Sequence, residues 1–185
     1  MSDKSATGDP VHGQAGPDPT LAGLAELATI EIAKDYLNFS SGHFTLFSPT
    51  ERENLHGHNW HVACEVTAPI NPGGICFDYA RVKRLLEKIC HELDERVLLP
   101  GRSPWLRVET TPELVVAHFA GERIPFLPRD VLVLPVRNIS VEELAGWILE
   151  RVRTGPEFAG EELLRMVIRV SSGSNQWAGC EWKAT

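Results

Sequence analysis

Three of the seven histidines, His43, His56 and His58, lie within sixteen residues of this chain. On a β-strand, side chains at i and i+2 point to the same face, so His56 and His58 project together. Gly57 between them has no side chain, which lets a neighbouring strand approach closely. His43 is expected at the end of the preceding strand, where it can face the same point across the sheet.

Three converging imidazoles are the protein half of a catalytic zinc site, whose fourth position is left for water or substrate. The alternative is that the His-Gly-His pair is only two polar residues on a solvated face. The other four histidines are interpreted as structural or exposed residues: His12, His61, His91 and His118.

The elements that must position these histidines are two strands, predicted at residues 27–39 and 55–67 from their alternating and β-branched residues. Two further strands are predicted near the C-terminus, at residues 163–171 and 177–182. Strands clustered in this way favour an α+β layer fold with an antiparallel sheet.

Two helices are predicted between these pairs of strands. Apolar residues at helical spacing indicate a helix over residues 79–95, with Asp78 as its N-cap. Ser140 begins the second helix, and Ser140 with Glu143 forms an S-x-x-E capping box.

A middle section rich in proline, residues 97–137, separates the two helices. Short β-like runs are predicted there at residues 106–109, 114–119 and 131–136. The section is interpreted as an inserted hairpin or arm.

Composition limits the class of protein. A length of 185 residues indicates one domain, or one domain plus an extension. The net charge of −7, from 18 basic and 25 acidic residues, argues against a general nucleic-acid binder. There is no apolar run long enough for a membrane helix, and no charged-then-apolar export signal. The four cysteines show no close pairing, so we expect reduced thiols and a cytoplasmic location.

The first residues differ in composition from the rest. Residues 1–22 are mostly Gly, Pro, Ala, Asp, Ser and Thr, which predicts a disordered tail. Residues 23–185 are then expected to form a single domain that carries the inserted arm at about 100–137.

Several motifs occur in an order that resembles one known family. F-S-S-G-H at 39–43 and L-H-G-H-N-W at 55–60 resemble the signature of the 6-pyruvoyl tetrahydropterin synthase and 6-carboxytetrahydropterin synthase family. G-G-I-C-F-D-Y-A-R-V-K, E-L-D-E-R-V-L and N-I-S-V-E-E-L-A follow as further matches. The resemblance covers residues 28–99 and 138–182, and only the arm falls outside it.

The resemblance implies a tunnelling fold, in which each subunit contributes a four-stranded antiparallel sheet with two helices on one face. Three subunits close a barrel, two trimers stack into a hexamer, and the active sites lie between subunits. It also implies that His43, His56 and His58 hold Zn²⁺, and that the substrate is the side chain of 7,8-dihydroneopterin triphosphate. The enzyme would be a carbon–oxygen or carbon–carbon lyase.

The chain departs from the family pattern at the catalytic cysteine. Glu53 stands in the R-E-x-L-H-G-H-N segment, where the main branches place that cysteine. This pattern resembles a third branch associated with cleavage to 6-hydroxymethyl-7,8-dihydropterin, so Glu53 is the candidate general base. The alternative is an exposed loop carboxylate, since a useful base would need a pKa raised by burial.

Two further departures concern proton transfer and pterin binding. The family's L-D-H becomes Leu-Asp-Glu, which leaves Asp94 and Glu95 as the catalytic candidates. Ser172 takes the place of the family's pterin-binding glutamate, and a hydroxyl is a weaker partner than a carboxylate. Ser172 and Glu142, the first glutamate of N-I-S-V-E-E-L-A, are the substrate-binding candidates that the resemblance implies.

Three functions therefore stay open. The first is a zinc-dependent lyase or cyclising enzyme acting on dihydroneopterin triphosphate or a related heterocycle. The second is a zinc enzyme of the same fold with a non-pterin substrate in a specialised biosynthetic pathway. The third is a catalytically silent zinc-binding homologue. Each binds a small molecule or metal as a homo-oligomer, with no nucleic-acid or membrane partner.

Overall fold

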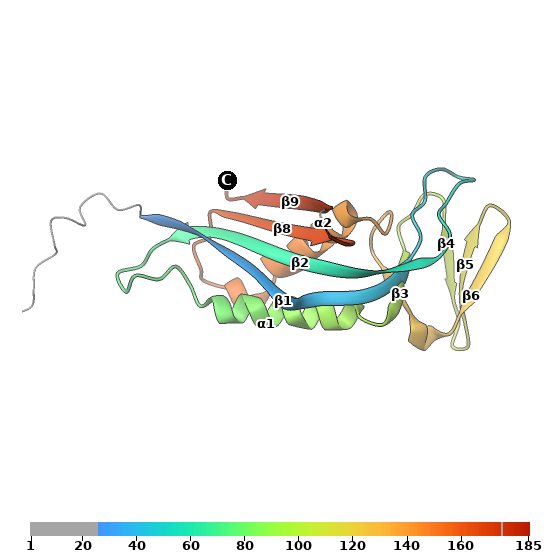
Figure 1. The fold of residues 1–185 in the computed structure, drawn as a ribbon, viewed down its shortest axis with the longest axis horizontal. Coiled ribbons are helices and arrows are strands. Elements are labelled where there is room, and N and C mark those ends of the chain that lie inside the picture. The colour runs from blue at the N-terminus through green and yellow to red at the C-terminus, as the bar shows by residue number, and fades with distance from the viewer. Residues whose placement is uncertain (1–25, 175) are drawn as a thin grey trace, which may run out of the picture.

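The computed structural model describes residues 26–174 and 176–185 (Figure 1). The tail predicted at residues 1–22 lies outside the described residues. Two long strands, β1 (Leu27–His43) and β2 (His56–Pro69), form an antiparallel pair along the length of the molecule. Both are longer than predicted, and the extension of β1 brings His43 into the strand.

Six strands form one mixed sheet in the order β7–β3–β1–β2–β8–β9. The pairs β1–β2, β2–β8 and β8–β9 are antiparallel, as predicted. The remaining strands have these bounds: β3 Arg96–Pro100, β7 Val131–Leu134, β8 Arg165–Ser171 and β9 Trp177–Lys183.

The sheet is larger than the expected four-stranded antiparallel sheet: the four predicted strands pair antiparallel, and two parallel strands are added beside β1. β3 pairs in parallel with β1 at Ser41 and Gly42, and β7 pairs in parallel with β3. β7 comes from the predicted arm, so the arm contributes a strand to the main sheet. Local sequence patterns do not identify a strand's partner, and parallel partners joined by a long connection leave no turn signal between them.

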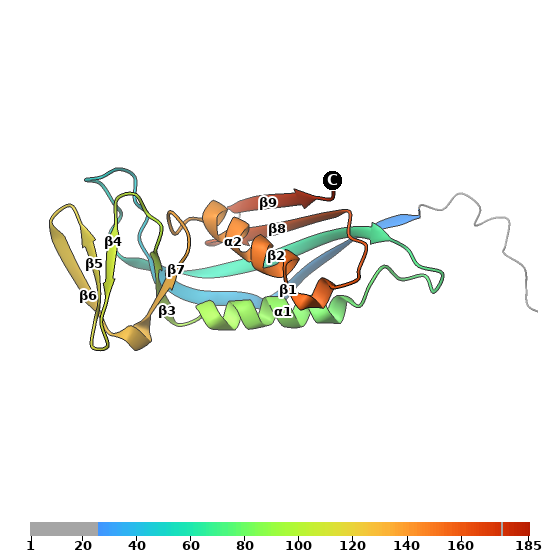
Figure 2. The same ribbon diagram turned by 180° about the vertical axis from the view of Figure 1, so that it is seen from behind.

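Two helices cover one face of the sheet, as Figure 2 shows most clearly. α1 (Tyr79–Leu93) packs on β1, and α2 (Val141–Arg153) packs on β8 and β9. The predicted apolar stripes are buried against the sheet: Val82, Leu85, Leu86, Ile89 and Leu93 of α1, and Leu144, Ile148, Leu149 and Val152 of α2. Together with Trp60 and Phe39 of the long strands they form the main core.

α1 ends two residues earlier than predicted. Its N-cap is Asp78, whose Oδ1 accepts from the Ala80 amide at 3.0 Å. After Asp94, Glu95 adopts the left-handed backbone region at φ 55°, and its amide donates to the Ser40 carbonyl at 2.8 Å. This turn sends the chain directly into β3, because a helix cannot continue through a left-handed residue.

The capping box of α2 forms only in part. Ser140 Oγ accepts from the Glu143 amide at 3.4 Å, as predicted. The Glu143 carboxylate accepts instead from the Arg137 amide at 2.8 Å and from the Arg137 guanidinium. The reciprocal bond to Ser140 is therefore replaced by an anchor on the segment that precedes the helix.

The arm is a three-stranded antiparallel sheet rather than a hairpin. Its strands are β4 (Arg107–Thr110), β5 (Val115–Phe119) and β6 (Glu122–Phe126). The tight β5–β6 turn places Ala120 and Gly121 at positive φ, 48° and 84°. Figure 1 shows the arm at the end of the molecule away from the start of β1. A short 3₁₀ turn, η2 (Pro128–Asp130), leads from it into β7, and a second, η3 (Pro156–Phe158), follows α2.

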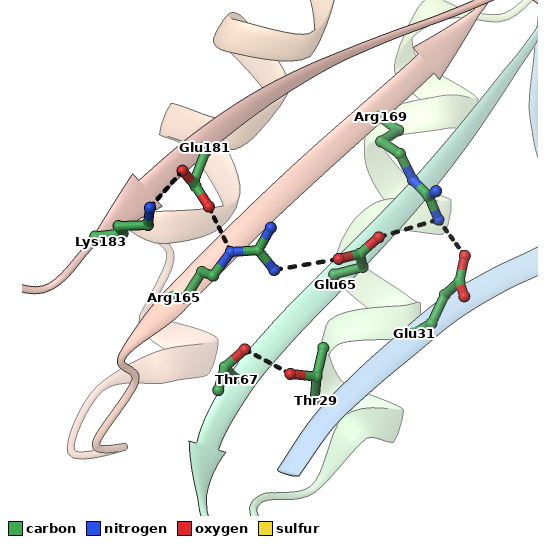
Figure 3. A network of polar contacts seen from close by, with 8 residues as sticks. All are labelled: Thr29, Glu31, Glu65, Thr67, Arg165, Arg169, Glu181 and Lys183. Carbon is green, nitrogen blue, oxygen red and sulfur yellow. Dashed lines mark hydrogen bonds and ion pairs between the residues drawn. The ribbon is translucent and has the colours of Figure 1, made fainter. Parts of the chain in front are cut away.

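The opposite face of the main sheet carries a ladder of alternating charges across four strands (Figure 3). Glu65 on β2 lies at its centre, 3.2 Å from Arg165 and 3.3 Å from Arg169. The ladder continues through ion pairs of Arg169 with Glu31 and of Arg165 with Glu181. Opposite charges on neighbouring strands favour this pairing register over a shifted one.

In the part of the chain that the structure describes, the helices are all too short or too polar to cross a membrane.

Candidate metal centre

The register of β1 and β2 brings the three histidines together. His43 is the direct cross-strand partner of His56, and Ser41 is the partner of His58. The register changes at an irregularity between Ala33 and Asn38. Without that change, the first half of β1 would continue in a register that places His43 opposite residue 53. The irregularity in β1 therefore assembles the trio.

The three imidazole rings converge as predicted. The Nε2 atoms of His56 and His58 are 3.0 Å apart. The ring centre of His43 lies 4.6 Å from that of His56 and 5.2 Å from that of His58. One ligand nitrogen from each ring lies within 4.8 Å of the other two. A single ion can contact all three nitrogens with only small side-chain adjustments, since zinc–nitrogen bonds are about 2.0–2.1 Å long.

Backbone carbonyls fix the tautomers of two rings. His43 Nδ1 donates to the Ile139 carbonyl at 2.9 Å, and His56 Nδ1 donates to the Asn54 carbonyl at 2.8 Å. Because a carbonyl only accepts, each Nδ1 carries the proton and each Nε2 keeps its lone pair. Metal-binding histidines generally donate their second ring N–H to a backbone carbonyl or a carboxylate in this way.

The free nitrogens fit a cation. His43 Nε2 is buried without a hydrogen-bond partner among the described residues. The lone pair of His56 Nε2 faces His58 at 3.0 Å, a contact that a shared proton or a bound cation would satisfy. An unpaired buried acceptor costs free energy, and coordination of a metal removes that cost.

Electrostatics keep the site in its metal-binding form. Burial lowers the pKa of His43 to about 4, outweighing its hydrogen bond to Ile139. Burial, followed by the nearby His56, lowers the pKa of His58. Both rings are therefore neutral at neutral pH, which is the state that binds metal.

A cavity of about 510 Å³ opens beside the histidines. Three of the predicted site residues line it together with the trio: Glu53, Glu142 and Ser172. The other lining residues were not predicted from sequence: Thr45, Phe47, Trp60, Ser140, Val141 and Gln176. Of these, Trp60 had a usable signal, because it follows His58 at i+2 and so shares its face.

Glu53 is held by Thr45 through both main chain and side chain. Its amide donates to the Thr45 carbonyl at 2.9 Å, and its Oε2 accepts from the Thr45 amide at 2.9 Å. Burial acts to raise the pKa of Glu53, but the bonds from Thr45 and the neighbouring His56 and His43 outweigh it, and the pKa is lowered. The raised pKa that a base was expected to need is therefore not found, and Glu53 is ionised at neutral pH.

Comparison with known proteins places this site in a family. Residues 31–182 match the 6-pyruvoyl tetrahydropterin synthase family. The chain belongs to that family. The match spans the histidine trio, both helices and the closing strands, and the trio fits the three-histidine zinc site that the sequence resemblance implied.

Individual known proteins are similar to this chain in sequence or in fold. A protein of Pyrococcus abyssi, provisionally named 6-carboxy-5,6,7,8-tetrahydropterin synthase, is 30% identical over 142 residues, covering 76% of this chain and 83% of that protein. The solved 6-pyruvoyl tetrahydropterin synthase of Plasmodium falciparum superposes with a TM-score of 0.80 at 25% identity, covering 86% of this chain and all of that one. The enzyme of Plasmodium vivax gives the same TM-score at 24% identity, with the same coverage of both chains.

Two other predicted catalytic residues lie away from the cavity within the single chain. Asp94 caps α1 and accepts from the Ser40 amide at 2.7 Å. Asp94 and Glu95 line a separate hollow together with His91 and Arg96. Glu95 also borders a hollow that His58 lines. Neither Asp94 nor Glu95 lies in the cavity that all three histidines line.

Trp60 packs against two of the three histidines, His43 and His58. The residue is fully buried, and its ring lies edge-on to His43 at 4.9 Å and to His58 at 5.6 Å between centres. Its indole N–H donates to the Ser41 carbonyl at 3.4 Å. The apolar ring excludes water from one side of the site, which contributes to the low pKa of His43.

Proposed function

We propose that this protein is a zinc-dependent lyase that acts on the side chain of 7,8-dihydroneopterin triphosphate, with His43, His56 and His58 as the zinc ligands. The observation that carries this proposal is the trio of converging imidazoles at one wall of a cavity that also contains Glu53. Membership of the pterin synthase family supports the choice of substrate.

The chemistry divides between the metal and the chain. When bound, zinc supplies a Lewis acid that holds side-chain oxygens and eases proton removal at the adjacent carbon. Glu53 is ionised and is fixed by Thr45 in the same cavity, so it can accept a proton from the substrate side chain. Its low pKa makes it a weaker base than a buried carboxylate but keeps it in the basic form.

Glu142 and Ser172 are proposed to recognise the heterocycle. Both line the cavity near the metal ligands. A carboxylate at Glu142 can accept from two adjacent ring N–H groups, while the Ser172 hydroxyl offers a single-point contact. We infer that Glu142 takes over the ring contact of the family glutamate that Ser172 replaces.

The proposed active form is a homo-oligomer built from trimers. β9 is an edge strand, and β3 covers β1 only at Ser41 and Gly42, so the N-terminal half of β1 forms a second edge of the described sheet. Exposed edges are templates for pairing with another copy, and pairing around a threefold axis would close the sheet. In such an assembly Asp94 and Glu95 would reach a histidine cavity from a neighbouring subunit.

One incubation tests the proposed reaction. Zinc-loaded protein is mixed with 7,8-dihydroneopterin triphosphate, and 6-substituted pterin products are identified by liquid chromatography with mass spectrometry. Turnover is expected in the wild type and lost in Glu53→Gln, which should retain its zinc. Glu51→Gln, an exposed carboxylate of the same loop, is the matched control. Absence of product from fully zinc-loaded wild type would contradict the proposal.

The oligomer is tested separately by light scattering coupled to size exclusion. A mass that is three or six times the 20.5 kDa chain is expected. A monomer at micromolar concentration would contradict the proposed assembly.

A second candidate is a zinc enzyme of the same fold that acts on a non-pterin heterocycle. The observation that favours it is the Ser172 and Gln176 pair on the cavity wall, since neutral groups there suit a ring without two adjacent donors. A thermal-shift comparison of neopterin with heterocycles lacking the aminopyrimidine edge separates the two candidates. Stabilisation by neopterin alone supports the first.

A further inference from the structure

The loop between β1 and β2, residues 44–55, carries the candidate base. Its two sides are joined by the double contact of Thr45 with Glu53 and by an isolated bridge between Leu46 and Arg52. The loop is therefore a small closed unit, and any shift of that unit moves Glu53 relative to the zinc ligands.

This loop rests on the arm. Phe44 and Leu46 are almost completely buried, and they belong to a second hydrophobic core rather than to the core beneath the helices. The other buried members of that core come from β3, from the residue before β4, from β5 and from the start of β7: Leu99, Leu106, Val115, Ala117, Phe119 and Val131. The apolar base of the loop is thus built almost entirely by the segment that lies outside the predicted family resemblance.

Arg52 ties the polar side of the loop to the same arm. Its Nη1 donates to the Glu53 carbonyl at 2.8 Å. Its Nη2 and Nε donate to Glu122 Oε2 at 2.7 and 3.2 Å, and its guanidinium carbon lies 5.1 Å from the centre of the Phe44 ring. The Arg52 side chain is 19% exposed, so one guanidinium connects β6 of the arm to the main chain of Glu53.

We propose that the arm is a brace for the catalytic loop, and that Arg52 and Glu122 are positioning residues that fix Glu53 relative to the histidines. The inference rests on the proposed role of Glu53 as the base. Neither residue lines the cavity, so both act through the loop. Placement matters because a displacement of about 1 Å at a catalytic group can cost up to about 100-fold in rate.

The kinetic test uses Glu122→Ala in the full-length, zinc-loaded protein. Removing the carboxylate frees Arg52 without altering the cavity wall, so kcat should fall about 10-fold while KM and zinc content stay unchanged. Glu122→Gln keeps an acceptor at the same place and should recover part of the loss. Arg52→Gln, which loses both the Glu122 and the Glu53 contacts, should show the larger fall.

Glu109→Ala is the matched control. Glu109 is also an exposed arm carboxylate, and it pairs with Arg107 and His118 rather than with the loop. Its removal should leave kcat unchanged.

Amide hydrogen exchange tests the brace without reference to turnover. Peptides covering residues 44–55 should exchange several-fold faster in Glu122→Ala than in wild type or Glu109→Ala, while peptides of α1 and α2 stay unchanged. Wild type without turnover would contradict the proposed function, and the exchange data would still decide whether the arm holds the loop. Unchanged exchange, unchanged kcat, or a fall in kcat accompanied by zinc loss would each overturn the inference.

Discussion

His43 Nδ1 lies 2.9 Å from the carbonyl oxygen of Ile139, a residue 96 positions later in the chain. The contact joins the end of β1 to the segment that leads into α2, and it turns the His43 lone pair toward His56 and His58. The metal centre is therefore oriented by a backbone group, which substitutions of Ile139 itself do not remove. The neighbouring side chain of Asn138, which bonds this segment to Leu46, can be substituted instead.

His56→Ala tests the centre directly. Loss of a residue that hydrogen-bonds to a metal ligand typically lowers metal affinity by roughly 10–100-fold. His56→Ala removes a ligand itself, so zinc affinity should fall by more than that. The free energy of unfolding of the metal-free protein should change by less than about 1 kcal/mol, since the His56 side chain is only partly buried. Zinc titration with a colorimetric chelator measures the first and urea unfolding the second. His61→Ala, an exposed residue of the same strand, should keep its zinc, and equal affinity in the two variants would contradict the assignment.

Asn138→Ala tests the support of the Ile139 carbonyl. The Asn138 side chain makes two hydrogen bonds to the backbone of Leu46: its Nδ2 donates to the Leu46 carbonyl at 2.8 Å, and its Oδ1 accepts from the Leu46 backbone N–H at 3.1 Å. The side chain therefore joins the loop to the segment that precedes α2. Leu46 is buried, and leaving its backbone unpaired should cost about 1–3 kcal/mol of stability. Zinc affinity should fall about 10-fold as His43 loses its fixed orientation. Urea unfolding and chelator competition give the two values, and zinc affinity equal to that of the wild type would argue against the connection.

Glu143→Gln should make stability less dependent on pH in acid. The hydrogen bond from the Arg137 guanidinium lowers the pKa of Glu143 below its usual value. The stabilisation is therefore present above the unfolded pKa of about 4.3 and is lost as pH falls through the lower folded pKa. The variant should be less stable than wild type at pH 7 because it loses the ion pair with Arg137. The loss should be only about 1 kcal/mol, since solvent screens the largely exposed Arg137 side chain. Urea unfolding at pH 7 and pH 3 checks this, and a difference that persists unchanged at pH 3 would contradict it.

The four cysteines should differ in reactivity. Burial raises the pKa of Cys64 and of Cys90 to about 12, so their thiolate populations at pH 8 are very small. Cys76 and Cys180 are only partly buried. Iodoacetamide at pH 8 should modify Cys76 and Cys180 first in the native protein, and all four in urea, as read by peptide mass spectrometry. Rapid native modification of Cys64 or Cys90 would show that the core opens locally.

The sequence alone predicted the two-histidine part of the candidate metal site because its signal is local, and the order of motifs added His43. His56 and His58 share a face by the two-residue period of a strand, and both helices were predicted from their spacing and N-caps. Glu53, Glu142 and Ser172 were found through motif order and do line one cavity. Each of these inferences needed only residue types, their spacing and the order of motifs along the chain.

Tertiary structure decided what depends on distant partners. The irregularity in β1 sets His43 opposite His56, the parallel strands β3 and β7 widen the sheet, and the arm supplies the core beneath the Glu53 loop. Asp94 ends α1 and Glu95 follows it, and neither lines the cavity that the three histidines share within one subunit. Register and partner choice are settled by the total packing of the chain, so residue type and spacing fixed which side chains could do chemistry, while packing determined which of them meet.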